Sequence, residues 1–165
     1  MGTRSTIKVK EENKKSKTIV NIYCQYDGYL EGVGMDLYNT FGHTKLLNGF
    51  NTHTAPAYAN GMECLAAQVV ASLKKGIGNV YLMPERCMGM EEYNYILYAA
   101  EKNEHGEVTA EDFTNTVVAE NTDELKKMFE YDNILSLKVT DCMGKVIYDD
   151  YLFRFKNFVN SQNEF

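Results

Sequence analysis

The sequence predicts an α+β fold: a mainly antiparallel sheet with about three to four helices packed on it. Strand-like segments follow one another in hairpin order near both ends of the chain, at residues 6–26 and 134–148. Apolar residues with helical spacing lie between and after these hairpins, and strands and helices do not alternate as a regular βαβ repeat would require. The length of 165 residues, with 44% hydrophobic and 24% charged residues, is typical of one globular domain, residues 1–165.

The first expected element is a basic hairpin. Thr6 to Lys10 alternates polar and apolar residues, and residues 18–26 are rich in β-branched and aromatic side chains. The polar residues at about 10–18 predict a solvated loop between these strands. Residues 1–19 hold six basic and two acidic side chains, a charge of +4, whereas the rest of the chain carries −10, for a total of −6. This balance argues against general nucleic-acid binding and leaves room for a local anion site.

Two helices are expected in the first half of the chain. The Asp-Gly pair at 27–28 predicts a turn, and residues 33–41 show helical spacing of apolar side chains. A mostly polar loop is expected from His43 to about Asn60. Asn60 then caps the second helix, with Glu63 placed as in a capping box, and an apolar stripe follows over several turns.

The second half of the chain is expected to contain several strands and two short helices. The expected strands are residues 80–83, 93–100, 113–119, 134–140 and 145–148. The expected helices are residues 121–129 and about 152–159.

The cysteines predict neither a zinc site nor a disulfide framework. Cys24, Cys64, Cys87 and Cys142 form no CxxC pair, so we interpret them as reduced and buried. No metal and no cofactor are expected. The longest uncharged apolar stretch, residues 65–73, is far too short to span a bilayer, which favours a cytoplasmic protein without a membrane partner.

A candidate ligand site lies around three glycines, Gly28, Gly32 and Gly34, that precede the first helix. Glycines let the backbone approach a ligand closely, and a helix N-terminus presents N–H groups to an anion. Arg4 can hold a phosphate or carboxylate through two hydrogen bonds. The alternatives are a plain tight turn for the glycines and a salt bridge from Arg4 to a neighbouring carboxylate.

Four tyrosines, Tyr23, Tyr26, Tyr29 and Tyr38, crowd the same turn. Tyrosine rings can stack on a base or line an interface, and the alternative is packing in the core. We expect one site that combines the turn with the strand start before it and the cap of the second helix. The predicted ligand-binding residues are Arg4, Ser5, Tyr23, Gln25, Tyr26, Asp27, Gly28, Tyr29, Glu31, Gly32, Gly34, Asn60 and Gly61.

The sequence shows no catalytic set. His43-Thr44 and His53-Thr54 lie in one polar loop, whereas two-histidine phosphoesterases carry H-x-[ST] motifs on facing strands. No Ser or Cys lies in a known nucleophile motif. Catalytic residues therefore stay unassigned, and the sequence favours a protein without catalytic activity.

Three motifs resemble a known family: Gly2-Thr3-Arg4-Ser5, residues 26–34 and residues 60–68. Its members are small bacterial and bacteriophage proteins with a GTRS start, a Y-x-Q-x-DGY-x-x-G-x-G turn and an NGM-x-CLAAQ helix. The resemblance covers roughly residues 1–100, with a weaker echo in the last hairpin and helix, and Cys24 stands where many relatives have Arg. It implies a bacterial or bacteriophage origin and brings no established activity.

Three functions follow from these features as expectations. The first is a binding protein for a nucleotide-like small molecule, in a phage setting an antagonist that sequesters a host immune signal in the host cytoplasm. The second is a protein–protein inhibitor that blocks a host enzyme through an acidic, Tyr-rich surface. The third is a nucleotide hydrolase that uses Asp27, Glu31 and His43. A homo-oligomer is compatible with each of them, and nucleic acid is not expected as a partner.

Overall fold

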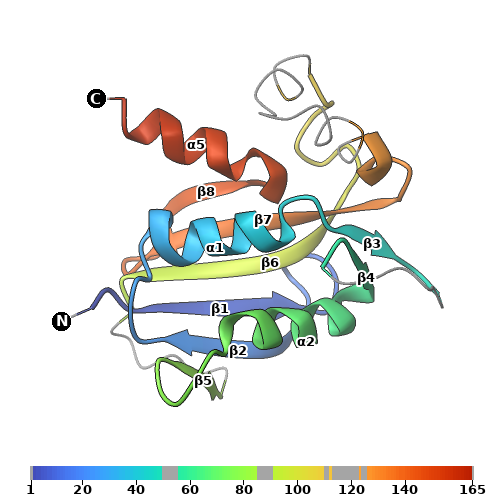
Figure 1. Cartoon of the computed structure of the whole chain (residues 1–165). Helices are drawn as coiled ribbons and strands as arrows, with labels where there is room; N and C mark the ends of the chain where they lie inside the picture. The colour runs from blue at the N-terminus through green and yellow to red at the C-terminus, as the bar shows by residue number, and fades with distance from the viewer. Residues whose placement is uncertain are drawn as a thin grey trace.

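The computed structural model describes residues 2–49, 56–84, 91–109, 112, 123 and 126–164 of the chain. Within them, eight strands form one mixed sheet in the order β4-β3-β7-β6-β1-β2-β5, and β8 pairs with β7 (Figure 1). The strands are β1 (Ser5–Lys10), β2 (Thr18–Cys24), β3 (Lys45–Leu47), β4 (Tyr58–Asn60), β5 (Val80–Met83), β6 (Tyr93–Glu101), β7 (Asn133–Asp141) and β8 (Val146–Tyr151). The helical segments are the π-helical turn η1 (Leu30–Gly34), α1 (Met35–Phe41), α2 (Gly61–Leu73), the 3-10 turn η2 (Leu152–Arg154) and α5 (Phe155–Gln162).

Most neighbouring strands of the sheet are antiparallel. β1 and β2 form the expected basic hairpin, and β7 and β8 form the expected hairpin around residues 141–145. Two pairs are parallel: β1 with β6 near the centre of the sheet, and β3 with β4 at its edge. The predicted α+β class with a mainly antiparallel sheet is confirmed, and the chain forms a single compact domain.

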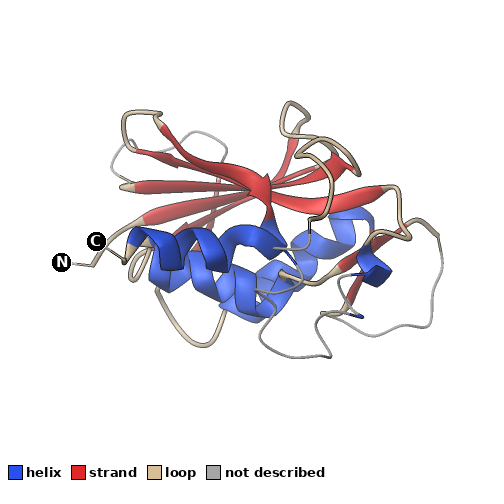
Figure 2. Ribbon diagram, turned by 90° about the horizontal axis from the view of Figure 1, so that it is seen from above, coloured by secondary structure: helices blue, strands red, loops and turns tan. Residues whose placement is uncertain are grey.

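The main core lies between the sheet and the helices α1, α2 and α5, which cover one face of the sheet (Figure 2). Alternation along β1 sends Ile7 and Val9 towards the helices and Lys8 to the opposite face. Each fully buried Leu, Ile or Phe contributes about 1.5–3 kcal/mol to folding. The largest buried members of this core are Tyr95, Phe41, Phe155, Ile7, Ile22, Leu37, Leu65 and Leu97.

A second, smaller apolar cluster lies on the opposite face of the sheet, over the end of β6. Arg154 holds the segments beside this cluster in place, because its guanidinium donates to both carboxylate oxygens of Asp112 at 2.9 and 3.0 Å. The same guanidinium donates to the carbonyls of His105 and Glu107 at 2.9 and 3.0 Å. The buried members of the cluster are Tyr98, Ala100, Met128, Ile134, Tyr151 and Phe153.

The prediction of a polar loop from residue 43 to 60 is wrong for part of this segment, because β3 and β4 belong to the sheet. Lys45, which makes this stretch polar in the sequence, is only 1% exposed, and its ammonium lies 4.8 Å from the centroid of the Tyr58 ring. Thr44 Oγ1 donates to the Pro56 carbonyl at 2.6 Å. Strands of three residues are too short for an alternation pattern to show, and residues 50–55 lie outside the described part of the chain.

The expected capping box at the start of α2 is also wrong. No side-chain hydrogen bond caps this helix, and Asn60 Oδ1 instead accepts from the backbone N–H of Gly49 at 3.0 Å. Asn60 therefore ties the end of β4 to the chain that follows β3.

The remaining expectations are tested only in part. The strand expected at 113–119 and part of the helix expected at 121–129 lie outside the described residues, and residues 126–128 are helical. Within the described residues, no helix is long and apolar enough to cross a membrane.

Candidate functional site

The glycine turn lies at the end of the sheet where β1 begins and β2 ends (Figure 1). Asp27 adopts a left-handed backbone with φ of 57°. The N–H of Gly28 donates to the Thr3 carbonyl at 2.9 Å, and the N–H of Val33 donates to the Asp27 carbonyl at 2.8 Å. These bonds fold the turn back onto the segment that leads into β1, and they bring Arg4, Ser5 and residues 23–34 together as predicted.

Close packing explains why the turn needs its three glycines. A Cβ at Gly28 would lie 2.7 Å from Ser5 Cβ, and a Cβ at Gly34 would lie 2.8 Å from the Phe155 ring. A Cβ at Gly32 would overlap the carbonyl oxygen of Asp27. Neighbouring atoms of the chain itself occupy the space beside these glycines, so the geometry favours the tight turn over an open anion cradle.

A buried tyrosine ties the turn to the centre of the sheet. Tyr95 on β6 is fully buried, and its hydroxyl donates to the Gly28 carbonyl at 2.8 Å. Burial raises the pKa of this hydroxyl far above its usual range, so Tyr95 stays a neutral donor.

We expect Tyr95→Phe to lower the free energy of unfolding by about 1–3 kcal/mol, because the Gly28 carbonyl loses this buried donor. Urea denaturation measures the loss. Tyr93→Phe is the matched control, since Tyr93 is half-buried on the same strand and its hydroxyl bonds to no described residue. Equal losses in the two variants would contradict a specific role for the bond.

Aromatic side chains of the turn are exposed rather than packed in the core. Tyr26 is 49% and Tyr29 is 39% exposed. The backbone N–H groups of Gln25 and Tyr26 donate to the backbone and side-chain oxygens of Asn79, at 2.8 and 3.1 Å, which joins the turn to the loop before β5. That loop and β5 carry three more exposed apolar side chains. We name the following five residues the apolar end: Tyr26, Tyr29, Ile77, Tyr81 and Leu82.

The other predicted tyrosines and the cysteines differ in exposure. Tyr23 is half-buried against the ring of Tyr81, with 6.2 Å between centroids. Burial raises the pKa of the Cys24 thiol to about 11, and the neighbouring Ser5 hydroxyl only partly offsets this. Cys142 is exposed, so its interpretation as a buried cysteine is wrong, and Cys87 lies outside the described residues.

Asn60 and Gly61 do not join the glycine turn. They lie at the start of α2, whose 13 residues span about 20 Å and lead towards β5. Gly61 instead lines a cavity of about 1050 Å³ at the end of the sheet where β1 stops. Sequence reasoning therefore combined two opposite ends of the sheet in one site.

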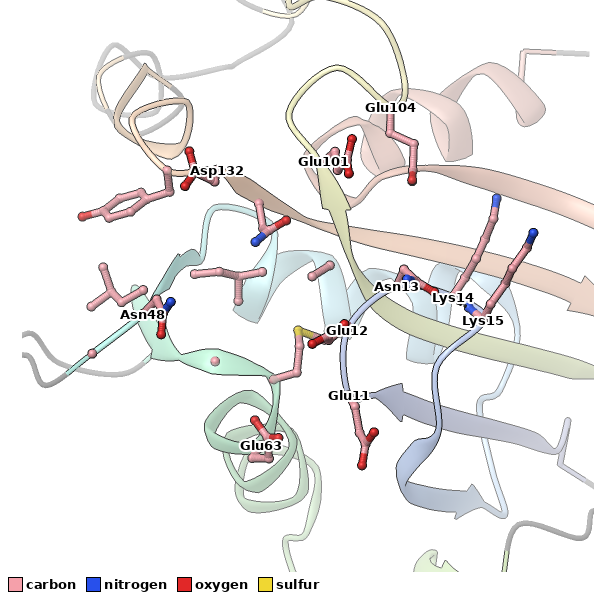
Figure 3. A pocket seen from close by; sticks show the side chains of 18 of the residues that line it. Glu11, Glu12, Asn13, Lys14, Lys15, Asn48, Glu63, Glu101, Glu104 and Asp132 are labelled. Carbon is pink, nitrogen blue, oxygen red and sulfur yellow. Dashed lines mark hydrogen bonds between the residues drawn. The ribbon is translucent and has the colours of Figure 1, made fainter.

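Seven carboxylates line this cavity together with two lysines and several amides. Figure 3 shows Glu63 on α2, Glu101 at the end of β6 and Asp132 in the loop before β7 around it. Sequence reasoning missed the cavity because its walls come from five segments far apart in the chain. Among the described residues, no three His, Cys, Asp or Glu side chains are arranged to hold a metal ion. The acidic lining members are Glu11, Glu12, Glu63, Glu101, Glu104, Glu130 and Asp132.

A hydrogen-bonded network of side chains around the buried Tyr98 lies beside this cavity. The Tyr98 hydroxyl donates to Asp149 Oδ1 at 2.5 Å and lies 2.9 Å from His105 Nε2, so the imidazole Nε2–H donates to Tyr98. Lys14 Nζ lies 2.8 Å from Asp149 Oδ2. Burial raises the pKa of Asp149, but the hydrogen bonds from Lys14 and Tyr98 outweigh it and leave the pKa below its ordinary value. Tyr98 is fully buried, so this chain of groups braces the sheet and offers no reactive atom to a substrate.

The three residues of the hydrolase hypothesis are not brought together. Asp27 and Glu31 are exposed at the glycine turn, whereas His43 follows the far end of α1, whose seven residues span about 10 Å. The His43 ring packs edge-on against Tyr38, with 6.0 Å between centroids. His53 lies outside the described residues.

No protein-family model, curated protein or solved structure matches this chain. Its function therefore has to be argued from the geometry of the described residues, and the resemblance of its three motifs to a bacterial and bacteriophage family stays a prediction.

Proposed function

We propose that this protein binds another protein through the apolar end and acts as an inhibitor of that partner. One observation carries the proposal: five of the seven exposed large apolar side chains among the described residues lie around the glycine turn and the edge strand β5. The other two, Met143 and Val146, lie on the β7–β8 hairpin, at the same end of the sheet but three strands away from β2. Clustered exposed apolar side chains rimmed by polar groups are typical of protein interfaces.

The loop that carries Ile77 is held in place by bonds within the chain itself, before any partner protein binds. Lys74 Nζ donates to the carbonyls of Gly78 and Val80 at 2.9 and 2.8 Å. Its ammonium also lies 5.5 Å from the centroid of the Tyr81 ring. A surface that is ordered before binding loses less conformational entropy on association, which favours a stable complex.

The charge at the apolar end indicates the chemistry of the partner. Asp27 and Glu31 are exposed beside the tyrosines, and the chain as a whole carries −6. A matching surface has an apolar recess with lysines or arginines at its rim, as in the cleft of an enzyme that binds an anionic substrate. Neither described cavity is lined by a residue of the apolar end, which favours a protein surface over a small molecule here. If the chain is phage-encoded, the partner is a host protein.

The test starts from capture of a stoichiometric partner from bacterial lysate, followed by calorimetry with the purified pair. We expect Ile77→Ser with Leu82→Ser to weaken binding by about tenfold or more, because both side chains leave the interface. Ile77 is fully exposed and Leu82 is 61% exposed, so the fold is unaffected. Met143→Ser with Val146→Ser removes two equally exposed apolar side chains elsewhere and keeps full affinity. The absence of any stoichiometric partner, or equal weakening by both pairs, would overturn the proposal.

A nucleotide-like ligand is the second candidate, favoured by the half-exposed rings of Tyr26 and Tyr29 close to the start of β1, where Arg4 lies. Aromatic faces stack on bases, and a guanidinium binds phosphate. Calorimetry against cyclic and ADP-ribose-type nucleotides tests it. Micromolar binding that Tyr29→Ala abolishes supports this candidate, and no micromolar binding across the panel removes it.

A further inference from the structure

We propose that the face of the sheet opposite to the helices binds single-stranded nucleic acid. Four lysines gather on this face, and we name them the lysine face: Lys8 and Lys10 on β1, Lys138 on β7, and Lys14 in the loop after β1. Lys14 belongs to the same side because its ammonium lies 5.8 Å from the centroid of the Tyr98 ring. The four lysines are separate from the apolar end, and the ligand proposed here does not depend on a protein partner.

Strand register places these cations in a regular array. Lys8 lies beside Ile96 of β6, and Ile96 lies beside Lys138 of β7. Lys8 and Lys138 are therefore two strands apart, about 10 Å, and Lys10 lies about 7 Å further along β1. Side chains alternate across a strand, so these residues share the side that faces away from α1, α2 and α5 (Figure 2).

The charges of this face are largely available to a ligand. In the described part of the chain, neither Lys8 nor Lys138 has an ion pair or a side-chain hydrogen bond. Lys10 Nζ donates to Thr18 Oγ1 at 2.9 Å. One carboxylate, Asp149, points to this face from the described strands, and Lys14 and Tyr98 already hold it. On the strands of this face, Lys8, Lys10 and Lys138 against Asp149 leave a charge of +2 in a chain whose total is −6.

Aromatic side chains continue the same face. Tyr23 of β2 and Tyr81 of β5 are partners in register, and Tyr81 is 45% exposed. Single-strand binders combine cations that contact phosphates with aromatic rings that stack on unpaired bases, often on an open sheet. Stacking requires unpaired bases, so a single strand rather than a duplex fits this surface. Thr6 and Asn21 lie on the same side between the lysines and these rings and are only 2% and 4% exposed, so the ring of Tyr81 lies at the edge of the accessible face.

Fluorescence anisotropy with labelled oligothymidine and oligouridine of about 12 nucleotides tests the proposal. The whole chain is titrated at about 50 mM salt, where a micromolar dissociation constant is expected for contacts that depend on charge. Three phosphate contacts predict that the logarithm of the binding constant falls with the logarithm of salt concentration with a slope of about −2.

Matched variants separate this surface from overall charge. Lys8→Gln with Lys138→Gln is expected to weaken binding about tenfold or more and to reduce the salt slope. Lys75→Gln with Lys156→Gln changes the net charge equally at sites away from this face and is expected to have little effect. No binding by the unmodified chain, or equal weakening by both pairs, would refute the proposal. Displacement of the oligonucleotide by an equal charge of poly-glutamate would also refute it, because the surface would then select an acidic polypeptide equally well.

Discussion

Replacing Gly32 with alanine is expected to destabilise the protein by at least about 3 kcal/mol, a large part of the stability of an ordinary domain. The new Cβ would overlap the carbonyl oxygen of Asp27 and would lie 3.0 Å from its carbonyl carbon. Backbone atoms cannot turn aside as a flexible side chain can, so the turn must open. Opening it breaks the bond from the Val33 N–H to the Asp27 carbonyl and disturbs the entry into α1.

Urea denaturation monitored by circular dichroism measures this loss. Gly76→Ala is the matched control, because no heavy atom lies within 4 Å of a Cβ at Gly76 and its backbone is not left-handed. That control is expected to change the free energy of unfolding by less than about 1 kcal/mol, in the stabilising direction if at all. A Gly32→Ala protein as stable as the unmodified chain would show that the turn has room for a side chain, and the anion-cradle interpretation would regain its support.

The turn also shows how a motif can be prominent in a sequence without a ligand to explain it. Gly28, Gly32 and Gly34 stand out in the sequence because three glycines in seven residues are unusual there. Each of them meets a different neighbour: the start of β1, the backbone of the turn itself, and α5. These neighbours are far apart in sequence, so spacing alone cannot separate close packing from ligand binding.

Elements with a local signal could be predicted from the sequence, and elements defined by distant partners could not. The β1–β2 hairpin and α2 have enough residues for a period of two or 3.6 to show. β3 has three residues and a buried lysine, and it is a strand only because β4 and β7 lie on either side of it. The parallel pairing of β1 with β6 joins residues almost ninety positions apart and leaves no mark in either strand.

The candidate site follows the same rule. Arg4, Ser5 and residues 23–34 were predicted together because a hairpin brings its two ends together, and the structure does so. Gly61 is expected at this site as part of the cap of the second helix, but the length of α2 separates it from the turn. The bond from the turn to Asn79 brings the parts of the apolar end together, and no periodicity in residues 76–79 predicts that contact.

Replacing Arg154 with methionine is expected to lower the free energy of unfolding at pH 7 by about 3–5 kcal/mol, because one buried ion-pair partner is removed and the other remains. The Arg154 side chain is 16% exposed and that of Asp112 is 9% exposed. Methionine keeps the apolar stem beside Tyr151 and Phe153 but donates no hydrogen bond, so the Asp112 carboxylate and the carbonyls of residues 105 and 107 lose their donors. Lys156→Met, a half-buried cation two residues further on, is the control and is expected to cost less than about 1 kcal/mol.

The pH dependence of that loss separates the ion pair from simple packing. Burial raises the pKa of Asp112, but the hydrogen bonds from Arg154 and Thr109 outweigh it and hold the pKa below its ordinary value of 3.8. A carboxyl whose pKa is depressed in the folded state stabilises the protein fully above its unfolded pKa and loses that contribution as the pH falls through the folded pKa. In Arg154→Met only burial and Thr109 act on Asp112, so protonation costs the variant less than the unmodified protein. We therefore expect the stability difference to be largest near pH 7 and to shrink as urea denaturation is repeated from pH 5 to pH 3, whereas a difference that stays constant with pH would mean that the guanidinium acts through packing rather than charge.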